Sequence, residues 1–287
     1  FLFYSRSTHD FNFEIGSSVN HECCGEGIHI LKRALRRGTR IMLSRSMLLP
    51  IAAIISALSA GMASAQNASL VSVQTPRGAK QAFILIQPAK PAAAVILFAG
   101  GHGRLGPGSA SSMAWGKGNF LVRVRDQFAA QGFMVAVADA PSDHQGARGM
   151  NAVFRMSAAH AADIGAIVDY LKKQAAVPVW LIGTSMGTFS AAGGAVALKS
   201  IDGLVLTSSI TRAKPNWNIR KSHPNGVASM RLSAVGVPTL IVSHRKDGCD
   251  ITPAADAPKL TKALSKARKV DVVLLDGGSP PRSGPCQ

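Results

Sequence analysis

The feature that most constrains this chain is an apolar strand that runs straight into a serine flanked by glycines. Residues 178–182 are mostly apolar and lead into Gly183-Thr184-Ser185-Met186-Gly187, after which the small residues at 188–198 suit a helix. A strand that turns sharply into a helix strains the residue at the bend, and flanking glycines leave room where a Cβ would clash. The pattern therefore predicts an exposed Ser185 hydroxyl beside the free N–H groups of a helix N-terminus.

This strand, serine and turn resemble the nucleophile elbow of the α/β-hydrolase family, in which Gly-x-Ser-x-Gly joins a strand to a helix. The resemblance implies that Ser185 is the nucleophile and that the Met186 N–H stabilises an oxyanion. It also implies an α/β-hydrolase fold, with a mostly parallel central sheet flanked by helices and a short cap insertion. The alternative is that Ser185 is only a polar turn between strand and helix.

The rest of the chain alternates between strand-like and helix-like segments. Short apolar or alternating runs predict an opening hairpin at 69–87 and further strands at 92–98, 133–138, 202–208, 239–243 and 270–275. Longer periodic segments predict helices at 120–131, 151–174 and 253–267. The Gly-, Ser- and Pro-rich residues 105–118 predict a mobile loop over the site. The resemblance implies that the irregular insertion at 210–232, with Trp217, forms the short cap and helps to bind substrate.

A second glycine-rich turn, Ala99-Gly100-Gly101-His102-Gly103, follows the strand at 92–98. Such a turn lets backbone N–H groups approach a ligand closely. The resemblance implies that Gly101 supplies the second oxyanion N–H, with His102 as the neighbour that could take its place and contact substrate. Two alternatives stay open, a plain turn and a phosphate-binding turn, although the Gly-Lys-Ser/Thr of a P-loop is missing.

The resemblance places the acid of a catalytic triad in the turn after the strand at 239–243, where Asp247 fits best and Asp250 is the second choice. A carboxylate there orients a histidine and stabilises the imidazolium that forms during catalysis. Asp247 could instead cap the turn. A metal site made of His244, Asp247, Cys249 and Asp250 is a further alternative, but no second ligand cluster supports it.

The same resemblance requires a histidine after the last core strand, yet no histidine follows His244. We therefore expect the chain to be truncated before its catalytic histidine, with the general base beyond Gln287. Two alternatives compete with this interpretation. A histidine of another loop could be the base, namely His102, His144 or His223, or the protein could bind ligands without catalysis.

The first 65 residues are typical of a leader rather than of a folded domain. Residues 42–65 combine a basic start, an apolar run from Leu48 to Met62 and an Ala63-Ser64-Ala65 end, as in a secretory signal peptide. The run is shorter than the ~20 residues that span a bilayer, so we expect cleavage after Ala65 and no stable membrane anchor. Residues 1–41 are interpreted as non-native or upstream leader, with Arg36-Arg37 as an alternative twin-arginine export signal.

Residues 66–287 are expected to form one hydrolase domain, incomplete at its C-terminus, that is periplasmic or secreted. They carry 25 lysines and arginines against 11 aspartates, a formal net charge of +14. The charges are scattered and not interleaved with aromatic residues, so we expect no nucleic-acid partner. Cys249 and Cys286 can form a disulfide in an oxidising compartment, and neither has the near-neighbour spacing of a metal site.

Together these observations predict an exported serine hydrolase of the carboxylesterase type. It would cleave carboxylic esters or related acyl bonds of a small-molecule substrate through a covalent acyl-Ser185 intermediate, without a metal or organic cofactor. The runner-up is a non-catalytic ligand-binding protein on the same scaffold. The sequence does not predict an oligomeric state.

Overall fold

The computed structural model describes residues 2–5, 11–14, 67–278, 284 and 286. The chain divides into two compact units, Phe1–Ser64 and Ala65–Gln287. In the first unit, strands β1 (Leu2–Ser5) and β2 (Phe11–Glu14) form an antiparallel pair. The predicted signal peptide at 42–65 lies outside the described residues, so it stays a prediction.

An eight-stranded sheet, with the order β10-β9-β8-β7-β5-β6-β4-β3, forms the centre of the second unit. The six strands from β5 to β10 run parallel, and β4 and β3 are added antiparallel at one edge. The bounds are β3 Asn67–Gln74, β4 Lys80–Gln87, β5 Ala93–Phe98, β6 Phe133–Ala138, β7 Val179–Ser185, β8 Gly203–Ser209, β9 Thr239–His244 and β10 Val270–Leu275. This mostly parallel sheet confirms the predicted fold class.

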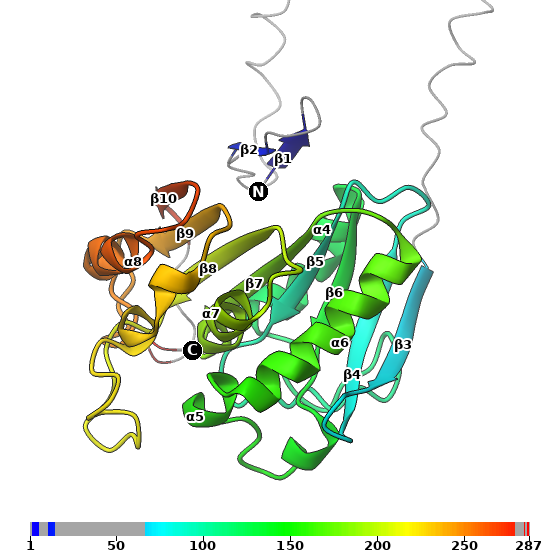
Figure 1. Cartoon of the computed structure of the whole chain (residues 1–287), viewed down its shortest axis with the longest axis horizontal. Helices are drawn as coiled ribbons and strands as arrows, with labels where there is room; N and C mark the ends of the chain where they lie inside the picture. The colour runs from blue at the N-terminus through cyan, green and yellow to red at the C-terminus, as the bar shows by residue number, and fades with distance from the viewer. Residues whose placement is uncertain (1, 6–10, 15–66, 279–283, 285, 287) are drawn as a thin grey trace, which may run out of the picture. The chain divides into compact units, whose positions relative to one another are not determined.

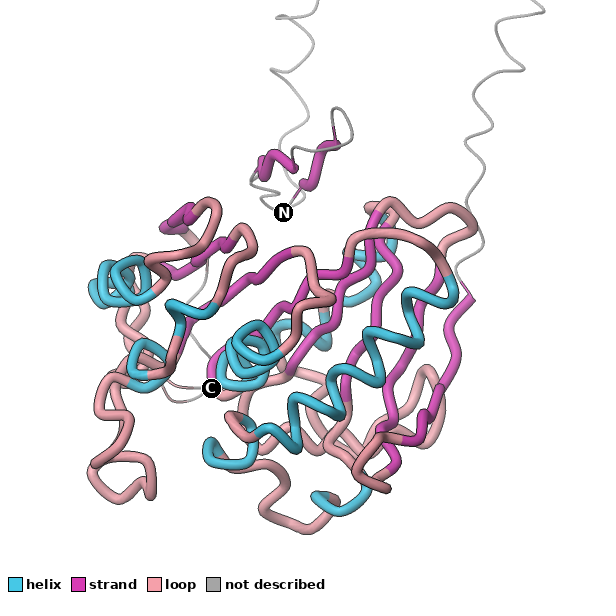
Figure 2. Tube along the Cα trace, viewed as in Figure 1, coloured by secondary structure: helices cyan, strands magenta, loops and turns pink. Residues whose placement is uncertain are grey.

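Helices cover both faces of the sheet, with α6 and α7 across the near face in Figure 1 and α4 behind it. The α-helices are α3 Phe120–Arg123, α4 Arg125–Ala130, α5 Ala152–Arg155, α6 Ala158–Gln174, α7 Gly187–Ala197 and α8 Ala257–Ala263. Short 3₁₀ turns are η1 Ser142–His144, η2 Gly226–Ser229, η3 Leu232–Ala234 and η4 Ala254–Asp256. Figure 2 shows long irregular connections, in pink, below the sheet in this view, on the side where α5 lies.

Burial explains why the strands form where the apolar runs predicted them. Every residue of β5 and β6 is buried, as expected for parallel strands covered on both faces. The helix predicted at 151–174 is instead two helices, because Ser157 accepts a hydrogen bond from the His160 N–H and caps a new start. The helix predicted at 120–131 is likewise split, at Val124.

The loop at 105–118 has internal structure that its composition does not indicate. The Trp115 N–H donates to the Leu105 carbonyl at 3.0 Å, and the Ala114 N–H donates to the Gly106 carbonyl at 3.1 Å. The buried Asp139 carboxylate accepts the Leu105 N–H at 2.6 Å. The loop is therefore tied to the end of β6 and held in a defined conformation, where a mobile one was expected.

Within the described part of the chain, no helix combines the length and apolar character needed to cross a membrane.

Candidate active site

Ser185 stands at the end of β7 with a backbone φ of 51°, in the left-handed region. The only other described non-glycine residue with positive φ is Ser208, at 38°, near the end of the adjacent strand β8. A Cβ on Gly183 would collide with the carbonyl of Gly187, and a Cβ on Gly187 would collide with the carbonyl of Phe98. Both flanking positions therefore require glycine, and the bend has the strained, crowded geometry that the motif predicts.

Helix α7 begins directly after the bend, with Met186 at its N-cap. The first N–H groups of a helix have no acceptor within the helix, so the Met186 N–H is available beside Ser185. The first turn of α7 holds no acidic residue that would offset the positive end of the helix dipole. Donors and dipole together favour a negative charge at this position.

The Gly100–Gly103 turn lies directly against the serine. A Cβ added to Gly100 would stand 3.1 Å from the Ser185 Cβ and 3.3 Å from the Asn119 Nδ2. The next residue, Gly101, has a φ of +59°, so the chain reverses here in a conformation that favours glycine. The turns that follow the adjacent parallel strands β5 and β7 therefore meet at the Ser185 side chain.

Trp115 covers this turn, and sequence reasoning missed it. A Cβ added to Gly101 would lie 2.8 Å from a ring carbon of Trp115, and the rings of Trp115 and His102 are 4.0 Å apart between centroids. Burial, then the charges of Arg104 and Arg155, lower the pKa of His102. The signal available in the sequence was a single aromatic residue in a loop of glycine and serine.

Arg155 is a second residue that sequence reasoning missed, because it reads there as an ordinary polar position on a helix. Its side chain is only 1 % exposed. The guanidinium donates to the Gly101 carbonyl at 3.2 Å and to the Ser190 hydroxyl at 2.9 Å. Burial lowers its pKa to about 9, which leaves the group charged at neutral pH.

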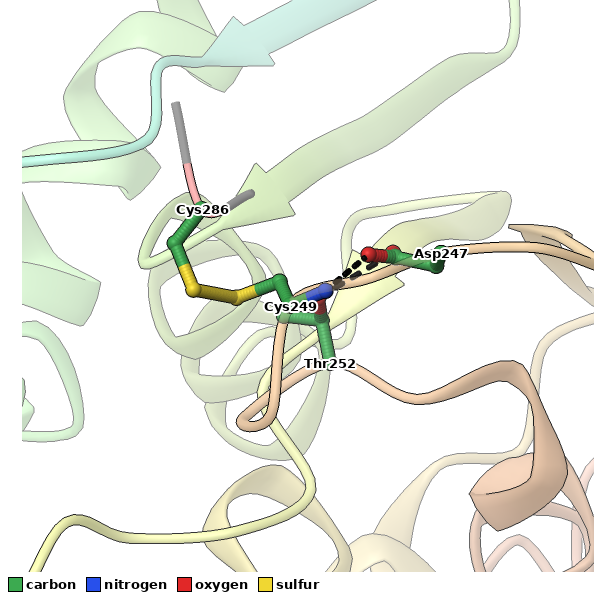
Figure 3. The surroundings of a disulfide bond; sticks show 4 residues. All are labelled: Asp247, Cys249, Thr252 and Cys286. Atoms are coloured by element: carbon green, nitrogen blue, oxygen red, sulfur yellow. Dashed lines mark hydrogen bonds between the residues drawn. A yellow bond between two sulfur atoms is a disulfide. The ribbon is translucent and has the colours of Figure 1, made fainter. Parts of the chain in front are cut away.

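The predicted acid, Asp247, is held within its own loop (Figure 3). One carboxylate oxygen accepts the Cys249 N–H at 3.0 Å and the other accepts the Thr252 hydroxyl at 3.1 Å. Cys249 forms a disulfide with Cys286, as predicted, and this bond ties the segment after β10 to the loop. Asp250 is exposed. The loop geometry is that of a capped turn, while a carboxylate oxygen can accept further hydrogen bonds.

The alternative metal site at this loop is not supported. The Cys249 sulfur is bonded to Cys286 in the disulfide. Both ring nitrogens of His244 already have hydrogen-bond partners, because Nε2 pairs with the Gly277 carbonyl at 2.8 Å and Nδ1 accepts the Lys246 N–H. No group of three or more potential His, Cys, Asp or Glu ligands occurs in the part of the chain that was described.

Each of the alternative histidine bases has partners away from Ser185. His102 accepts the Arg104 N–H, His144 stacks on Phe154 at 3.5 Å, and His223 pairs with the Ser222 hydroxyl at 2.9 Å. Among the described residues, no hydrogen bond joins a histidine to the Ser185 hydroxyl. Trp217, in the insertion, is partly buried and packs against the apolar core.

Three solved structures show what the chain is similar to. An esterase from Pyrococcus furiosus is 17 % identical with a TM-score of 0.53, and 74 % of this chain matches 84 % of that one. A putative dienelactone hydrolase from Klebsiella pneumoniae is 13 % identical with a TM-score of 0.53, over 74 % and 87 % of the two chains. The α/β hydrolase GrgF from Penicillium is 12 % identical with a TM-score of 0.53, over 74 % and 90 %.

The mostly parallel sheet, the covering helices and the strained Gly-x-Ser-x-Gly turn between β7 and α7 define an α/β protein. The structural neighbours agree, and the chain has the α/β-hydrolase fold. No protein-family model matches the sequence, and no curated protein matches it significantly.

Proposed function

We propose that this protein is a serine hydrolase that cleaves carboxylic esters through an acyl-enzyme intermediate on Ser185. The observation that carries the proposal is the conformation of Ser185, which is held at positive φ between a buried strand and a helix N-terminus. Strain of this kind persists only where the surroundings impose it, and it concentrates at functional sites.

In the proposed reaction, the Ser185 oxygen attacks the ester carbonyl and forms a C–O bond, while its proton passes to a general base. The carbonyl oxygen becomes an oxyanion, which the Met186 N–H and an N–H of the Gly101–His102 turn stabilise. Collapse of the tetrahedral intermediate breaks the bond to the alcohol, which leaves with that proton. Water then adds to the acyl-serine by the same route, releasing the carboxylic acid and restoring the hydroxyl.

The walls of the site suit a substrate with an apolar group. Trp115 and His102 present adjacent rings over the turn that carries one oxyanion donor. We propose that these rings contact the substrate beside its carbonyl, and that Trp217 contributes from the insertion. Aromatic side chains supply large apolar contact areas with a defined orientation, which suits an acyl or alcohol group of the same kind.

Asp247 is the proposed acid of the triad, supported by its position after β9 at the end of the parallel sheet. The histidine that it would orient is not identified among the described residues. We also propose that the protein is exported, supported by the signal-like residues 42–65 and by the disulfide, a bond that persists in oxidising compartments.

The proposal is tested with a fluorophosphonate probe and a p-nitrophenyl ester on the full chain. Wild type should be labelled and should hydrolyse the ester, and Ser185→Ala should abolish both. Ser208→Ala is the matched control, because Ser208 shares the positive φ. An unlabelled wild type, or labelling that survives Ser185→Ala, would contradict the proposal.

A second candidate is a ligand-binding protein without catalysis. It is favoured by the two hydrogen bonds that engage Asp247 within its own loop, and by the absence of a hydrogen bond from any described histidine to Ser185. Calorimetry separates the candidates. This alternative expects saturable binding of intact ester, with no labelling and no turnover.

A further inference from the structure

Arg155 is a buried cation without a buried anion. Its side chain is 1 % exposed, and in the described part of the chain no carboxylate lies within ion-pair distance of it. Its hydrogen-bond partners are all neutral: the Ser190 hydroxyl and the carbonyls of Gly101 and Met150. Burying a charge without an ion-pair partner costs free energy, which hydrogen bonds to neutral groups offset only in part.

On one side, the Arg155 guanidinium contacts α7, the helix that follows Ser185. Ser190 lies on α7, and its hydroxyl also shares a hydrogen bond of 2.9 Å with the Nε2 of the buried His160. Burial, then the charge of Arg155, lower the pKa of His160 to about 3, so its ring is neutral at pH 7. The groups next to Arg155 on this side, the Ser190 hydroxyl and the His160 ring behind it, are therefore polar but uncharged. They give the guanidinium no counter-charge.

On its other side, the same guanidinium contacts the Gly100–Gly103 turn beside Ser185. It donates to the Gly101 carbonyl, and a Cβ on Gly103 would collide with its Nη2. The Gly101 carbonyl and the His102 N–H belong to one peptide unit, which is trans, so they point in opposite directions. Because the carbonyl points at the buried Arg155, the His102 N–H points away from it, and no hydrogen bond of the described residues uses that N–H.

We propose that Arg155 is a positioning residue of the oxyanion site, which orients the Gly101–His102 peptide so that the His102 N–H donates to the oxyanion. Its unpaired charge finds a counter-charge only when the oxyanion develops, so it stabilises the transition state more than the neutral ester. This inference rests on the proposed hydrolase function. The proposed positioning role of Arg155 differs from a packing role, in which the guanidinium would only fill space in the core.

The test compares Arg155→Met with Arg155→Lys in the full chain. Arg155→Met keeps much of the volume and removes the charge and the donors, so kcat should fall by about 10- to 100-fold with KM for a neutral ester within twofold. Affinity for a boronic acid, whose serine adduct is an anion, should fall by a similar factor. Arg155→Lys keeps the charge and should recover part of the kcat loss.

Arg77→Met is the matched control. The Arg77 side chain is 23 % exposed, and its hydrogen bonds go to the carboxylates of Asp143 and Asp163 and not to the Gly101 carbonyl. The Arg77→Met variant should have a lower melting temperature than the wild type and an unchanged kcat per folded molecule. If Arg155→Met does not fold, Ser190→Ala removes one support of the guanidinium and should lower kcat about 3- to 10-fold.

The outcomes separate the two levels of inference. A wild type that neither reacts with fluorophosphonate nor hydrolyses ester overturns the hydrolase function and this inference with it. A wild type that reacts, with Arg155 variants that change only the melting temperature while kcat and boronate affinity stay constant, overturns the Arg155 inference alone.

Discussion

The two ends of the candidate site are built by different physical means. At the Ser185 end, buried backbone segments pack so closely that only glycine fits at Gly183 and Gly187. At the Asp247 end, the loop after β9 is held by two hydrogen bonds and a disulfide to Cys286. Close backbone packing leaves the proposed nucleophile, Ser185, one position, whereas hydrogen bonds and a covalent link hold the proposed acid, Asp247. A substitution at the Ser185 end should therefore abolish both the local structure and labelling. A substitution at the Asp247 end should reduce activity or stability while the fold is kept.

The largest effect is expected for Gly187→Ala. The new Cβ would overlap the Phe98 carbonyl, so β5 and α7 must separate, and we expect a loss of more than about 3 kcal/mol in unfolding free energy together with loss of labelling at Ser185. Gly236→Ala is the control, because a Cβ there meets nothing within 4 Å. Thermal unfolding and probe labelling measure both effects. If Gly187→Ala kept normal stability and labelling, close backbone packing would not be what positions Ser185, and the difference between the two ends would be disproved.

Asp247→Asn tests the acid in the other region. If Asp247 orients a histidine, kcat should fall by about 10³- to 10⁴-fold while the melting temperature changes little. Asp250→Asn is the control and should leave kcat within a few-fold, since Asp250 is exposed. A lower melting temperature with unchanged kcat would instead assign Asp247 to turn capping.

Removing the disulfide should affect stability more than chemistry at Ser185. Cys249→Ser opens a cross-link between residues 37 apart in sequence, and the chain-entropy relation gives a loss of about 3–4 kcal/mol. Denaturant unfolding of the wild type with and without reductant measures the same quantity independently. Labelling of Ser185 should persist in the folded variant, and its disappearance would mean that the two ends are coupled.

Acid should weaken the Ser185 region through His160. The pKa of this buried histidine is lowered to about 3, mainly by burial and then by the charges of Arg155, His144 and Arg77. The unfolded chain therefore takes up a proton below about pH 6.5 that the folded chain refuses, so stability falls as pH decreases. Between pH 7 and pH 4.5 we expect a loss of about 2.5 kcal/mol in the free energy of unfolding. His160→Gln should flatten this dependence, which denaturant unfolding between pH 7 and pH 4.5 measures.

The smallest effect is expected at Trp115. Trp115→Leu removes the ring that covers Gly101 and faces His102, so KM for an aromatic ester should rise about 3- to 10-fold with kcat less affected. Steady-state kinetics with aromatic and short aliphatic esters provide the comparison. An equal change for both esters would contradict a role in substrate contact.

The strands could be predicted from the sequence more closely than the helices. Strands β6 and β10 have the predicted bounds, 133–138 and 270–275, because each consists of a continuous or alternating apolar run, which is a local pattern of the sequence. The helix divisions at Val124 and Ser157 were not predicted. A polar residue inside a periodic stretch caps a helix only if its side chain turns back to the backbone, and tertiary packing decides whether it does.

The same limit applies to the site. The bend at Ser185 depends on a local pattern of strand, glycines and helix, so the sequence indicated it. Arg155 acts on residues 35 and 54 positions away along the chain, and Asp139 holds a loop 34 positions away. No local pattern marks such residues, because an arginine on a short helix and an aspartate after a strand are common in other roles.

By itself, the sequence determined the mostly parallel sheet and the position of the serine, because apolar runs and obligatory glycines act over a few residues and leave few alternative backbones. Only the tertiary structure decided what surrounds that serine. The buried Arg155 and the covering Trp115 both arise where segments separated in sequence meet. Burial and close approach are properties of the packed chain, so the chemistry of these groups emerges only when the fold is complete.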